Sequence, residues 1–517
     1  MEAKSERREW EREASKALAI FMAFGTKGDV YPIAAIAAAF ACDQTQYHVV
    51  LVTHSAHQDL SCNIKERHVV FLPIKSPPVL AMNGSQVCSG SGLDFSIQKK
   101  VTIEKHRQEC YAVVEEVFGH GPRMEGDFIL INYFALEGWS LAEHFCVRCV
   151  VAAPYVVPYS APSSFERQFR KEFPLLYKYL QEAPADKACW KDVIHWMWPL
   201  FTEKWGSWRN DVLNLSPCPF TDPVTGVPTL HNWPSSPLLL YGFSKEVVEC
   251  PDYWPSNVHV CGFWFLPLEW QFSCRGCGET SAHFPCQRTW TNEEFCSTHM
   301  KLQYFLNTSA PVRPIFIGLS SVGSMGYLRN PEAFLLVIRT VLEITDYRFI
   351  LLTSGYEPLD EAVRFTAAET CYEPYSKDGT SIFDDRLFCF SGMIPYKWLF
   401  PKCAAAIHHG GSGSTAAALY AGVPQVLCPF IMDQFYWAEK MHWLGVAPEP
   451  LKRIHLVPDQ CSEMSARVAA NMLSKAINNA LSPEVKSRAL EISERIRLED
   501  GVTEAVRILK QEMVYPN

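Results

Sequence analysis

The fold class is decided by residues 17–54, which read ALAIFMAFGTKGDVYPIAAIAAAFACDQTQYHVVLVTH. The apolar run at 17–24 ends in a glycine-containing turn. An alanine-rich segment with a proline near its start follows at 30–41, as is typical of a helix. Residues 47–54 are rich in β-branched side chains, which favour a strand. The order strand, turn, helix and strand predicts the first βαβ unit of a parallel sheet.

The same alternation continues along the chain. Apolar runs at 127–133 and 149–156 predict buried strands, with a helix at 136–145 between them. A second series begins with a strand and turn at 314–324 and a helix at 334–344. We therefore expect an α/β protein divided into a charged leader at 1–16, a first domain at 17–264, a cysteine-rich linker at 265–310, a second domain at 311–480 and C-terminal helices at 481–517.

The composition disfavours several classes of protein. Of 517 residues, 48% are hydrophobic and 20% are charged, which indicates a folded chain. The 47 Lys and Arg residues against 56 Asp and Glu give a net charge of −9, so we expect no nucleic-acid partner. The start carries no secretory apolar run, and no segment has the pattern of a membrane-spanning helix. We expect a cytoplasmic protein in which most of the 19 cysteines are reduced.

Two segments leave alternatives open. The aromatic stretch at 174–214 is interpreted either as packed helices or as a lip that contacts an acceptor or a membrane. Its tryptophans are Trp190, Trp196, Trp198, Trp205 and Trp208. The linker either binds zinc through soft ligands or is a reduced insertion without metal, since its spacing is no standard finger. The candidate zinc ligands are Cys274, Cys277, His283 and Cys286.

A histidine-, glycine- and serine-rich segment at 408–415 lies between an expected strand and an alanine-rich helix predicted from Thr415 to Ala421. Glycines allow the backbone to approach a ligand, and a helix N-terminus supplies N–H donors and a positive dipole, which suit a diphosphate. The segment is neither a Walker loop nor a dinucleotide fingerprint. Farther on, Asp433 and Gln434 follow a strand and offer an acceptor and a donor to a polyhydroxylated ring. Asp433 could instead cap the next helix.

Three stretches carry a resemblance to a known family. Residues 398–446, WLFPKCAAAIHHGGSGSTAAALYAGVPQVLCPFIMDQFYWAEKMHWLGV, closely resemble the donor-binding segment of sterol 3-β-glucosyltransferases, within the UDP-glycosyltransferase superfamily. FGTKGDVYPIAAIAAAF (24–40) resembles their N-terminal signature, and residues 483–506 resemble their C-terminal helices. The resemblance implies a GT-B fold, with two Rossmann-like domains facing across a cleft and C-terminal helices that cross back to the first.

The resemblance also implies inverting transfer of glucose from UDP-glucose to a sterol or a similar lipophilic alcohol, without metal or cofactor. Peripheral contact with a membrane would supply such an acceptor. A triterpenoid or phenolic acceptor and a catalytically weakened nucleotide-sugar-binding protein are the alternatives. Asp29 matches the family's candidate base, although it could instead cap the following helix, and His54 is the reserve candidate or a core histidine.

The remaining site residues follow from the same resemblance. Those expected around the donor are Gly318, Ser320, Ser321, His409, Gly411, Ser412, Gly413, Ser414, Thr415, Asp433 and Gln434. Gly25, Thr26 and Gly28 form the N-terminal turn, and the region of the nucleotide base is expected at Met393, Ile394 and Trp398. Trp398 could instead be a core residue, which leaves the backbone around Met393 and Ile394 for the base. The chain departs from the family's Gly-Phe-Gly-Ser turn, since it has Gly318-Leu319-Ser320-Ser321.

Overall fold

The structure is a computed structural model. It describes residues 16–76, 92–119, 121–122, 124–155, 161–184, 186–230, 233–272, 297–308, 313–353, 356–370, 376 and 378–514. The chain divides into two compact units. Of the described residues, those within 16–76, 92–265 and 500–514 belong to unit 1, and those within 266–499 belong to unit 2. The candidate zinc ligands of the linker lie outside the described residues.

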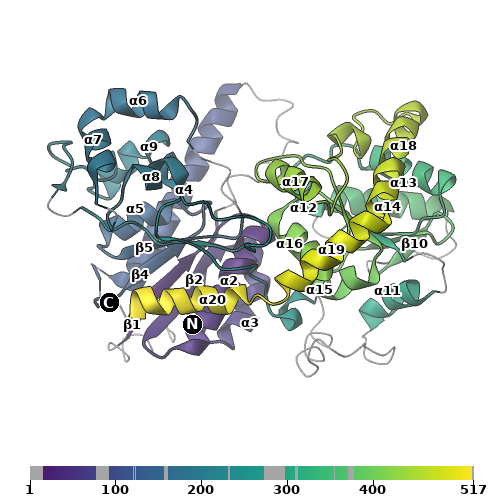
Figure 1. The fold of residues 1–517 in the computed structure, drawn as a ribbon, viewed down its shortest axis with the longest axis horizontal. Helices are drawn as coiled ribbons and strands as arrows, with labels where there is room; N and C mark the ends of the chain where they lie inside the picture. Colours follow the sequence, from purple (N-terminus) through teal and green to yellow (C-terminus); the bar gives the residue numbers. More distant parts are fainter. Residues whose placement is uncertain are drawn as a thin grey trace. The chain divides into compact units, whose positions relative to one another are not determined.

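Unit 1 is built on a parallel seven-stranded sheet with the order β3-β2-β1-β4-β5-β6-β7 (Figure 1). Every residue of β1 is buried, as expected of a central strand covered on both faces. The strands are β1 (Ala17–Met22), β2 (Tyr47–His54), β3 (Val69–Ile74), β4 (Phe128–Ile131), β5 (Arg148–Ala153), β6 (Leu239–Tyr241) and β7 (Val258–Val260).

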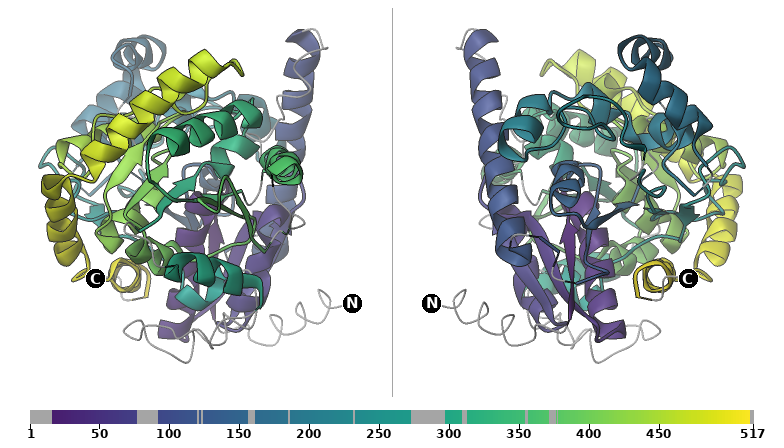
Figure 2. Two further views of the ribbon diagram at one scale, coloured as in Figure 1. Left: turned by 90° about the vertical axis from the view of Figure 1, so that its right-hand side faces the viewer. Right: turned by 90° about the vertical axis from the view of Figure 1, so that its left-hand side faces the viewer.

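Helices follow the strands of unit 1, as βαβ connections require. Figure 2 shows α4 as one long helix. The helices, with η for 3-10 and π types, are α2 (Lys27–Asp43), η1 (Ser55–Leu60), α3 (Ser61–Lys65), α4 (Gly92–Phe118), α5 (Glu137–His144), α6 (Phe165–Glu172), α7 (Pro174–Glu182), α8 (Trp190–Asp192), η4 (Val193–Met197), α9 (Pro199–Thr202), η5 (Trp208–Val212), α20 (Gly501–Leu509) and η10 (Lys510–Val514).

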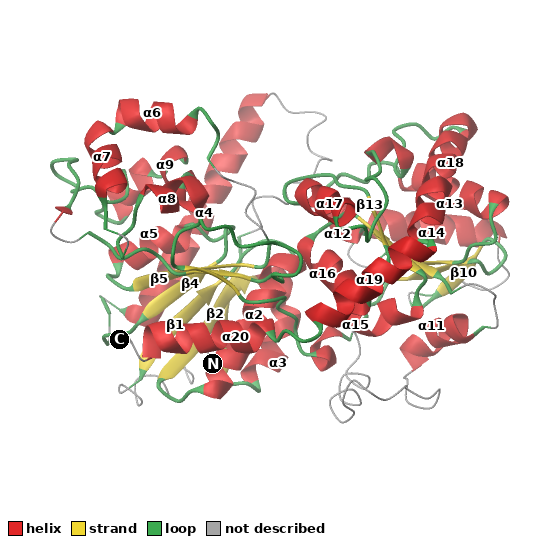
Figure 3. Ribbon diagram, viewed as in Figure 1, coloured by secondary structure: helices red, strands yellow, loops and turns green. Residues whose placement is uncertain are grey.

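Unit 2 has a six-stranded sheet with the order β10-β11-β9-β8-β12-β13, in which only the β10–β11 pair is antiparallel (Figure 3). Its strands are β8 (Ile315–Gly318), β9 (Phe349–Leu352), β10 (Thr380–Ile382), β11 (Leu387–Phe390), β12 (Ala405–His408) and β13 (Gln425–Leu427). Its helices are η7 (Leu268–Gln271), α11 (Ser297–Asn307), α12 (Ser320–Ser324), α13 (Pro331–Ile344), α14 (Glu357–Thr370), α15 (Tyr396–Leu399), η8 (Phe400–Lys402), α16 (Ser412–Ala421), α17 (Gln434–Trp443), η9 (Arg453–His455), α18 (Glu463–Ala480) and α19 (Pro483–Ile496).

Each sheet reverses its strand order beside its first strand. In unit 1 the chain moves from β1 to β2 on one side and later to β4 on the other, and in unit 2 it moves from β8 to β9 and later to β12. Ligands of open parallel sheets bind at such switch points, beyond the carboxyl ends of the strands. The fold therefore directs attention to the ends of β1 and β4 and to those of β8 and β12.

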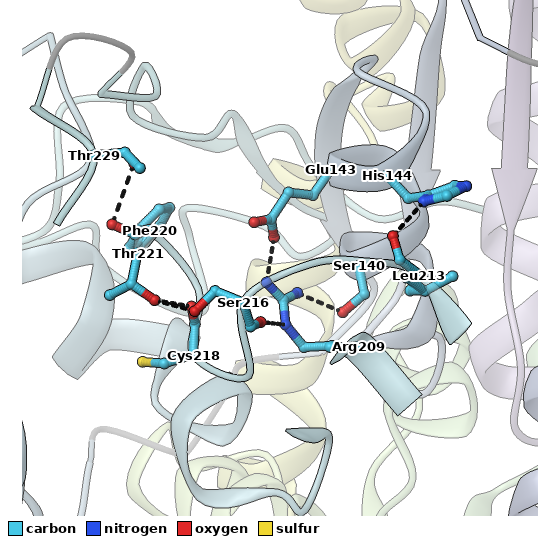
Figure 4. A network of polar contacts seen from close by, with 10 residues as sticks. All are labelled: Ser140, Glu143, His144, Arg209, Leu213, Ser216, Cys218, Phe220, Thr221 and Thr229. Carbon is cyan, nitrogen blue, oxygen red and sulfur yellow. Dashed lines mark hydrogen bonds and ion pairs between the residues drawn. The ribbon is translucent and has the colours of Figure 1, made fainter. Parts of the chain in front are cut away.

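Three tryptophans of the aromatic stretch in unit 1 are buried rather than exposed. Trp196, Trp205 and Trp208 are at most 6% exposed, which favours the packed-helix interpretation over an exposed lip for these three side chains. A buried arginine on η5, Arg209, ties the stretch to α5: its guanidinium donates to Ser140 Oγ and Glu143 Oε2, each at 2.9 Å (Figure 4). Arg209 Nε also donates to the carbonyl of Ser216 at 2.8 Å. Each of the three guanidinium nitrogens thus donates a hydrogen bond, which compensates for the burial of the charge.

The last described residues return to unit 1. Helix α20 packs against α2, and its first residue, Gly501, accepts a hydrogen bond from the Trp264 indole at 3.0 Å. The hydroxyl of Tyr47 donates to the carbonyl of Met513 at 3.0 Å, and Lys510 Nζ lies 2.9 Å from Asp43 Oδ2. These contacts join the two ends of the sequence within one unit.

No helix among the described residues combines the length and the apolar character needed to cross a membrane.

Candidate functional site

In unit 2 the turns that follow β8, β12 and β13 are neighbours. His408, the last residue of β12, is in register with Gly318 at the end of β8 and with Leu427 at the end of β13. The serine-rich turn after β8, the glycine-rich turn after β12 and the loop before α17 therefore emerge at one edge of the sheet. This edge brings together most residues that the sequence assigns to a donor site.

His408 shapes the glycine-rich turn from within the core. Its Nδ1 accepts a hydrogen bond from the Gly410 N–H at 3.1 Å, so Nε2 carries the proton and donates to Gln425 Oε1 at 2.9 Å. Burial lowers the pKa of His408 to about 3, which keeps the ring neutral. Gly410 has φ +84°, and a Cβ there would lie 3.0 Å from the Gln434 carbonyl oxygen. Only glycine suits this position.

The N-terminus of α16 presents backbone donors without a side-chain cap. Its N-cap residue is Gly411, and the first intrahelical bond runs from the Thr415 N–H to the Gly411 carbonyl at 3.0 Å. The N–H groups of Ser412, Gly413 and Ser414 have no partner within the helix. Thr415 is fully buried. The backbone donors suited to an anion are therefore those of Ser412 to Ser414.

His409 and Ser321 connect the turns after β12 and β8. His409 Nε2 lies 3.3 Å from Ser321 Oγ, and burial lowers the pKa of His409 to about 4. A Cβ on Gly411 would lie 2.5 Å from His409 Nε2, so a side chain there would displace the ring. The Ser414 side chain hydrogen-bonds to the hydroxyl of Tyr396, whose pKa burial raises to about 12. A neutral imidazole and two serine hydroxyls thus surround the uncapped helix end.

The Asp433-Gln434 pair lies at the start of α17. Asp433 occupies the N-cap position, as the capping alternative predicts, but its side chain makes no capping bond to the backbone. Its Oδ2 instead accepts from the Trp437 indole at 3.1 Å. Gln434 Oε1 accepts from the N–H groups of Phe430 at 2.9 Å and Ile431 at 3.2 Å. These bonds fix the loop before α17 and commit the amide oxygen of Gln434. Its amide nitrogen is the end of the side chain suited to bind a ligand.

The region expected near a nucleotide base follows β11. Met393 is half-buried, whereas Ile394 and Trp398 are buried. Lys402 lies over the Trp398 ring, with Nζ 3.9 Å from its centroid, and burial lowers the pKa of this lysine to about 8. The Trp398 ring is therefore packed within unit 2, in keeping with the core alternative.

In unit 1, Asp29 sits in the first turn of α2. Thr26 is the N-cap residue, and Asp29 Oδ2 accepts from both the backbone N–H and the hydroxyl of Thr26 at 2.7 Å. Asp29 thus completes a capping box from the third helical position and is not itself the N-cap. Burial raises the pKa of Asp29 to about 6, although the bonds from Thr26 oppose the shift. This value suits a general base at neutral pH.

The turn before α2 is built around that carboxylate. Gly25 has φ +109°, and a Cβ there would lie 2.6 Å from Asp29 Oδ2. Its carbonyl lies 3.1 Å from the Nε2 of His57, a buried histidine of η1. Gly28 lies within the first turn of α2, between Thr26 and Asp29. The residues Gly25, Thr26 and Gly28 therefore shape the surroundings of Asp29.

His54 is a core residue. It is 3% exposed, its Nδ1 lies 3.0 Å from the Ser76 carbonyl, and burial lowers its pKa to about 4. Its ring packs against those of Phe24 and His106, with centroids at 4.7 Å and 5.3 Å. The structure favours the core alternative for His54.

Two polar residues beside Asp29, Asn132 and His57, are not predicted from the sequence. Asn132, directly after β4, bonds to the backbone of the Asp29 turn, and His57 bonds to Gly25. The sequence signal available for Asn132 was an asparagine directly after an apolar run. Among the described residues, no group of three or more His, Cys, Asp or Glu side chains is arranged to hold a metal ion.

Comparisons with known proteins find similarity in sequence and in fold. Residues 383–494 match the family model "Erythromycin biosynthesis protein CIII-like, C-terminal domain". A sterol 3-beta-glucosyltransferase of Arabidopsis thaliana is 26% identical over 506 residues, which are 95% of this chain and 68% of that protein. One of Cryptococcus neoformans is 23% identical over 96% of this chain and 27% of its own length. The chain is thus similar to sterol 3-beta-glucosyltransferases along nearly its whole length.

The fold of the chain is also found among solved structures. The glycotransferase of kitacinnamycin superposes with a TM-score of 0.55 at 13% identity, covering 96% of this chain and 99% of that one. The fold is thus that of the GT-B glycosyltransferases, as the sequence predicts. The chain spans about two thirds of the Arabidopsis protein and about a quarter of the Cryptococcus protein.

Proposed function

We propose that this protein transfers glucose from UDP-glucose to the hydroxyl of a sterol or a sterol-like lipophilic alcohol, with inversion at the anomeric carbon. The observation that carries the proposal is the similarity to a sterol 3-beta-glucosyltransferase along 95% of the chain. The proposal includes a cytoplasmic location and peripheral contact with a membrane, because a lipophilic acceptor partitions into lipid.

In the proposed reaction, Asp29 is the general base. Its carboxylate accepts the proton of the acceptor hydroxyl while the hydroxyl oxygen attacks the anomeric carbon. The bond between that carbon and the diphosphate oxygen breaks, and its electron pair leaves with UDP. A carboxyl pKa near 6 supports this role, because the group is ionised at neutral pH and still basic enough to take a proton.

The groups of unit 2 would bind the donor. Fixed N–H donors of Ser412 to Ser414 and the dipole of α16 are suited to the charge that develops on the leaving diphosphate. His409 and Ser321 would add neutral hydrogen-bonding groups beside it. Asp433 and the amide nitrogen of Gln434 would orient the glucose hydroxyls, within a loop that Gln434 itself fixes.

The test is UDP release by the purified protein, given UDP-glucose and a panel of sterols, triterpenoids and flavonoids. Sterol-dependent release that Asp29→Asn abolishes supports the proposal. Release with only triterpenoids or flavonoids replaces the acceptor and retains the chemistry. Binding of UDP-glucose without release on any acceptor contradicts the proposal and identifies a nucleotide-sugar-binding protein.

A further inference from the structure

Asn132 connects the two strands that flank the switch point of unit 1. It lies directly after β4, is fully buried, and stands beside β1, because Met22 is in register with Ile131. Its Oδ1 accepts from the Phe24 N–H at 3.2 Å, and its Nδ2 donates to the Phe24 carbonyl at 2.8 Å. The side-chain amide of Asn132 thus binds both the N–H and the carbonyl of Phe24.

The same amide reaches the helix that carries Asp29. Asn132 Nδ2 donates to the carbonyl of Asp29 at 3.3 Å, and Oδ1 accepts from the Phe134 N–H at 3.2 Å. An asparagine amide offers donors on one side and an acceptor on the other, and this arrangement uses both. Removing it would leave buried backbone groups without partners, so the turn would have to move toward water.

We propose that Asn132 is a positioning residue for Asp29: by holding the backbone of Phe24 and Asp29 against β4, it keeps the Asp29 carboxylate in a fixed, partly desolvated position. The inference rests on the proposed function, because it concerns the same base. Asn132 acts through the backbone, and a donor bound by unit 2 does not require it. Its loss therefore affects catalysis more than binding of the nucleotide.

The described part of the chain places several charged and titratable groups near this turn, among them His54 and His106, whose rings pack against Phe24. Lys27 lies on α2, and His57 and Asp59 lie on η1; none of the three is among the causes of the Asp29 pKa shift, which are burial and the two bonds from Thr26. The carboxyl therefore responds mainly to its exposure to water and to any new charge placed beside it. A substitution of Asn132 that exposes the carboxyl to water should therefore lower the pKa of Asp29, and one that adds a negative charge should raise it.

The experiment compares Asn132→Ala with Asn132→Asp in the full chain. Asn132→Ala releases the turn and hydrates the carboxylate, so we expect kcat to fall about 10- to 100-fold and the acid limb of the pH–rate profile to move to lower pH. Asn132→Asp keeps an acceptor oxygen but adds a second carboxylate, so the acid limb moves to higher pH. In both variants the KM for UDP-glucose stays within about threefold.

The matched control is Asn257, whose Nδ2 donates to the Ser236 carbonyl at 2.9 Å elsewhere in unit 1. Asn257→Asp and Asn257→Ala should leave the acid limb in place. Opposite shifts at position 132 alone support the inference, since a merely structural asparagine would lower stability without moving the limb in two directions. Acid limbs that stay in place, or that move in the same direction, overturn it.

A second readout does not depend on activity. In the parent protein, Asp29→Asn should abolish part of the change in Tm between pH 5 and pH 8, because the buried carboxyl titrates in that range. If Asn132 positions Asp29, that part shrinks in an Asn132→Ala background. An undiminished difference overturns the inference even where no acceptor is turned over. Absence of transfer by the parent protein, by contrast, contradicts only the proposed function.

Discussion

The turn before α2 in unit 1 and the turn before α16 in unit 2 have glycines at the same positions but differ in how the helix N-terminus is capped. Each has a glycine with positive φ before the N-cap residue, Gly25 or Gly410, and a glycine at the second helical position. At the third position unit 1 has Asp29, which bonds back to Thr26, whereas unit 2 has Ser414. The N-terminus of α2 is capped by its own carboxylate, whereas the N-terminus of α16 has no capping side chain.

The comparison shows how the same arrangement of glycines before a helix can support two different chemical roles. A carboxylate in the first turn satisfies the helix end and is held there in a partly desolvated state, as a base requires. A helix end without a capping side chain keeps its dipole and its donors for an anion. The side chain at the third helical position is therefore the feature to exchange.

The largest effect is expected at Asp29 itself. Asp29→Asn keeps an oxygen for the Thr26 bonds and removes the base, so we expect UDP release to fall about 10²- to 10⁴-fold. Steady-state assays of UDP release measure the loss. Calorimetric titration with UDP is the control, and its Kd should not change. Activity within tenfold of the parent would remove Asp29 from the role of base.

Closing the second helix end is the next largest perturbation. Ser414→Asp puts a carboxylate at the position in α16 that Asp29 occupies in α2, so it competes with a diphosphate for the same N–H groups. We expect the Kd for UDP to rise about 10- to 100-fold, equivalent to about 1.4–2.7 kcal/mol. Ser414→Ala, which loses only the hydroxyl and its bond to Tyr396, is the control and should weaken binding less. Equal affinities for UDP in the two variants would contradict an anion site at this helix end.

The next prediction concerns the pH dependence of activity and stability that Asp29 gives to the turn before α2. Because burial raises the pKa of Asp29 to about 6, kcat/KM should fall below about pH 6, by up to about tenfold per pH unit as the carboxylate becomes protonated. Stability has the reverse dependence: the folded state binds this proton more tightly than the unfolded state, so the contribution of Asp29 is most favourable below pH 4 and is lost as pH rises through 6. Profiles of kcat/KM and of Tm against pH measure both. A kcat/KM that stays constant down to pH 5 would exclude Asp29 as the titrating base.

The smallest effect is expected at His54. The ring is buried, is hydrogen-bonded to the Ser76 carbonyl and has a pKa lowered to about 4, so it is neutral and shielded at pH 7. His54→Gln should change kcat/KM for UDP-glucose by less than about threefold, far below the loss expected when a base is removed. A thermal melt serves to confirm that the variant is folded. A loss of a hundredfold in a folded variant would restore His54 as a candidate base.

Local sequence pattern was sufficient for much of the fold. The strand predicted at 47–54 coincides with β2, and the helix predicted at 136–145 closely matches α5. Both helices that follow the two turns begin three residues before their predicted starts, α2 at Lys27 and α16 at Ser412. The cause is the same in both, since a first turn that contains glycine has the composition of a loop while its backbone is already helical.

The contacts around the candidate base could not be predicted in the same way. That Asp29 completes a capping box depends on where the helix begins, and the sequence pattern placed that start too late. The bonds of Asn132 to Phe24 and Asp29 depend on β4 lying beside β1, which the order of strands along the chain does not specify. Residues that match a family motif are visible in a sequence, whereas a residue that acts across a sheet is visible only once the strand order is known.

The return of the C-terminal segment to unit 1 has a consequence for the order in which the protein is made. Synthesis proceeds from the N-terminus, so the strands of unit 1 leave the ribosome before unit 2. The partners of Asp43, Tyr47 and Trp264 are Lys510, Met513 and Gly501, and these residues are synthesised after unit 2. The unit with the candidate base is thus the first to begin folding and the last to be completed, and it acquires its final contacts only after the donor-binding candidate has been synthesised.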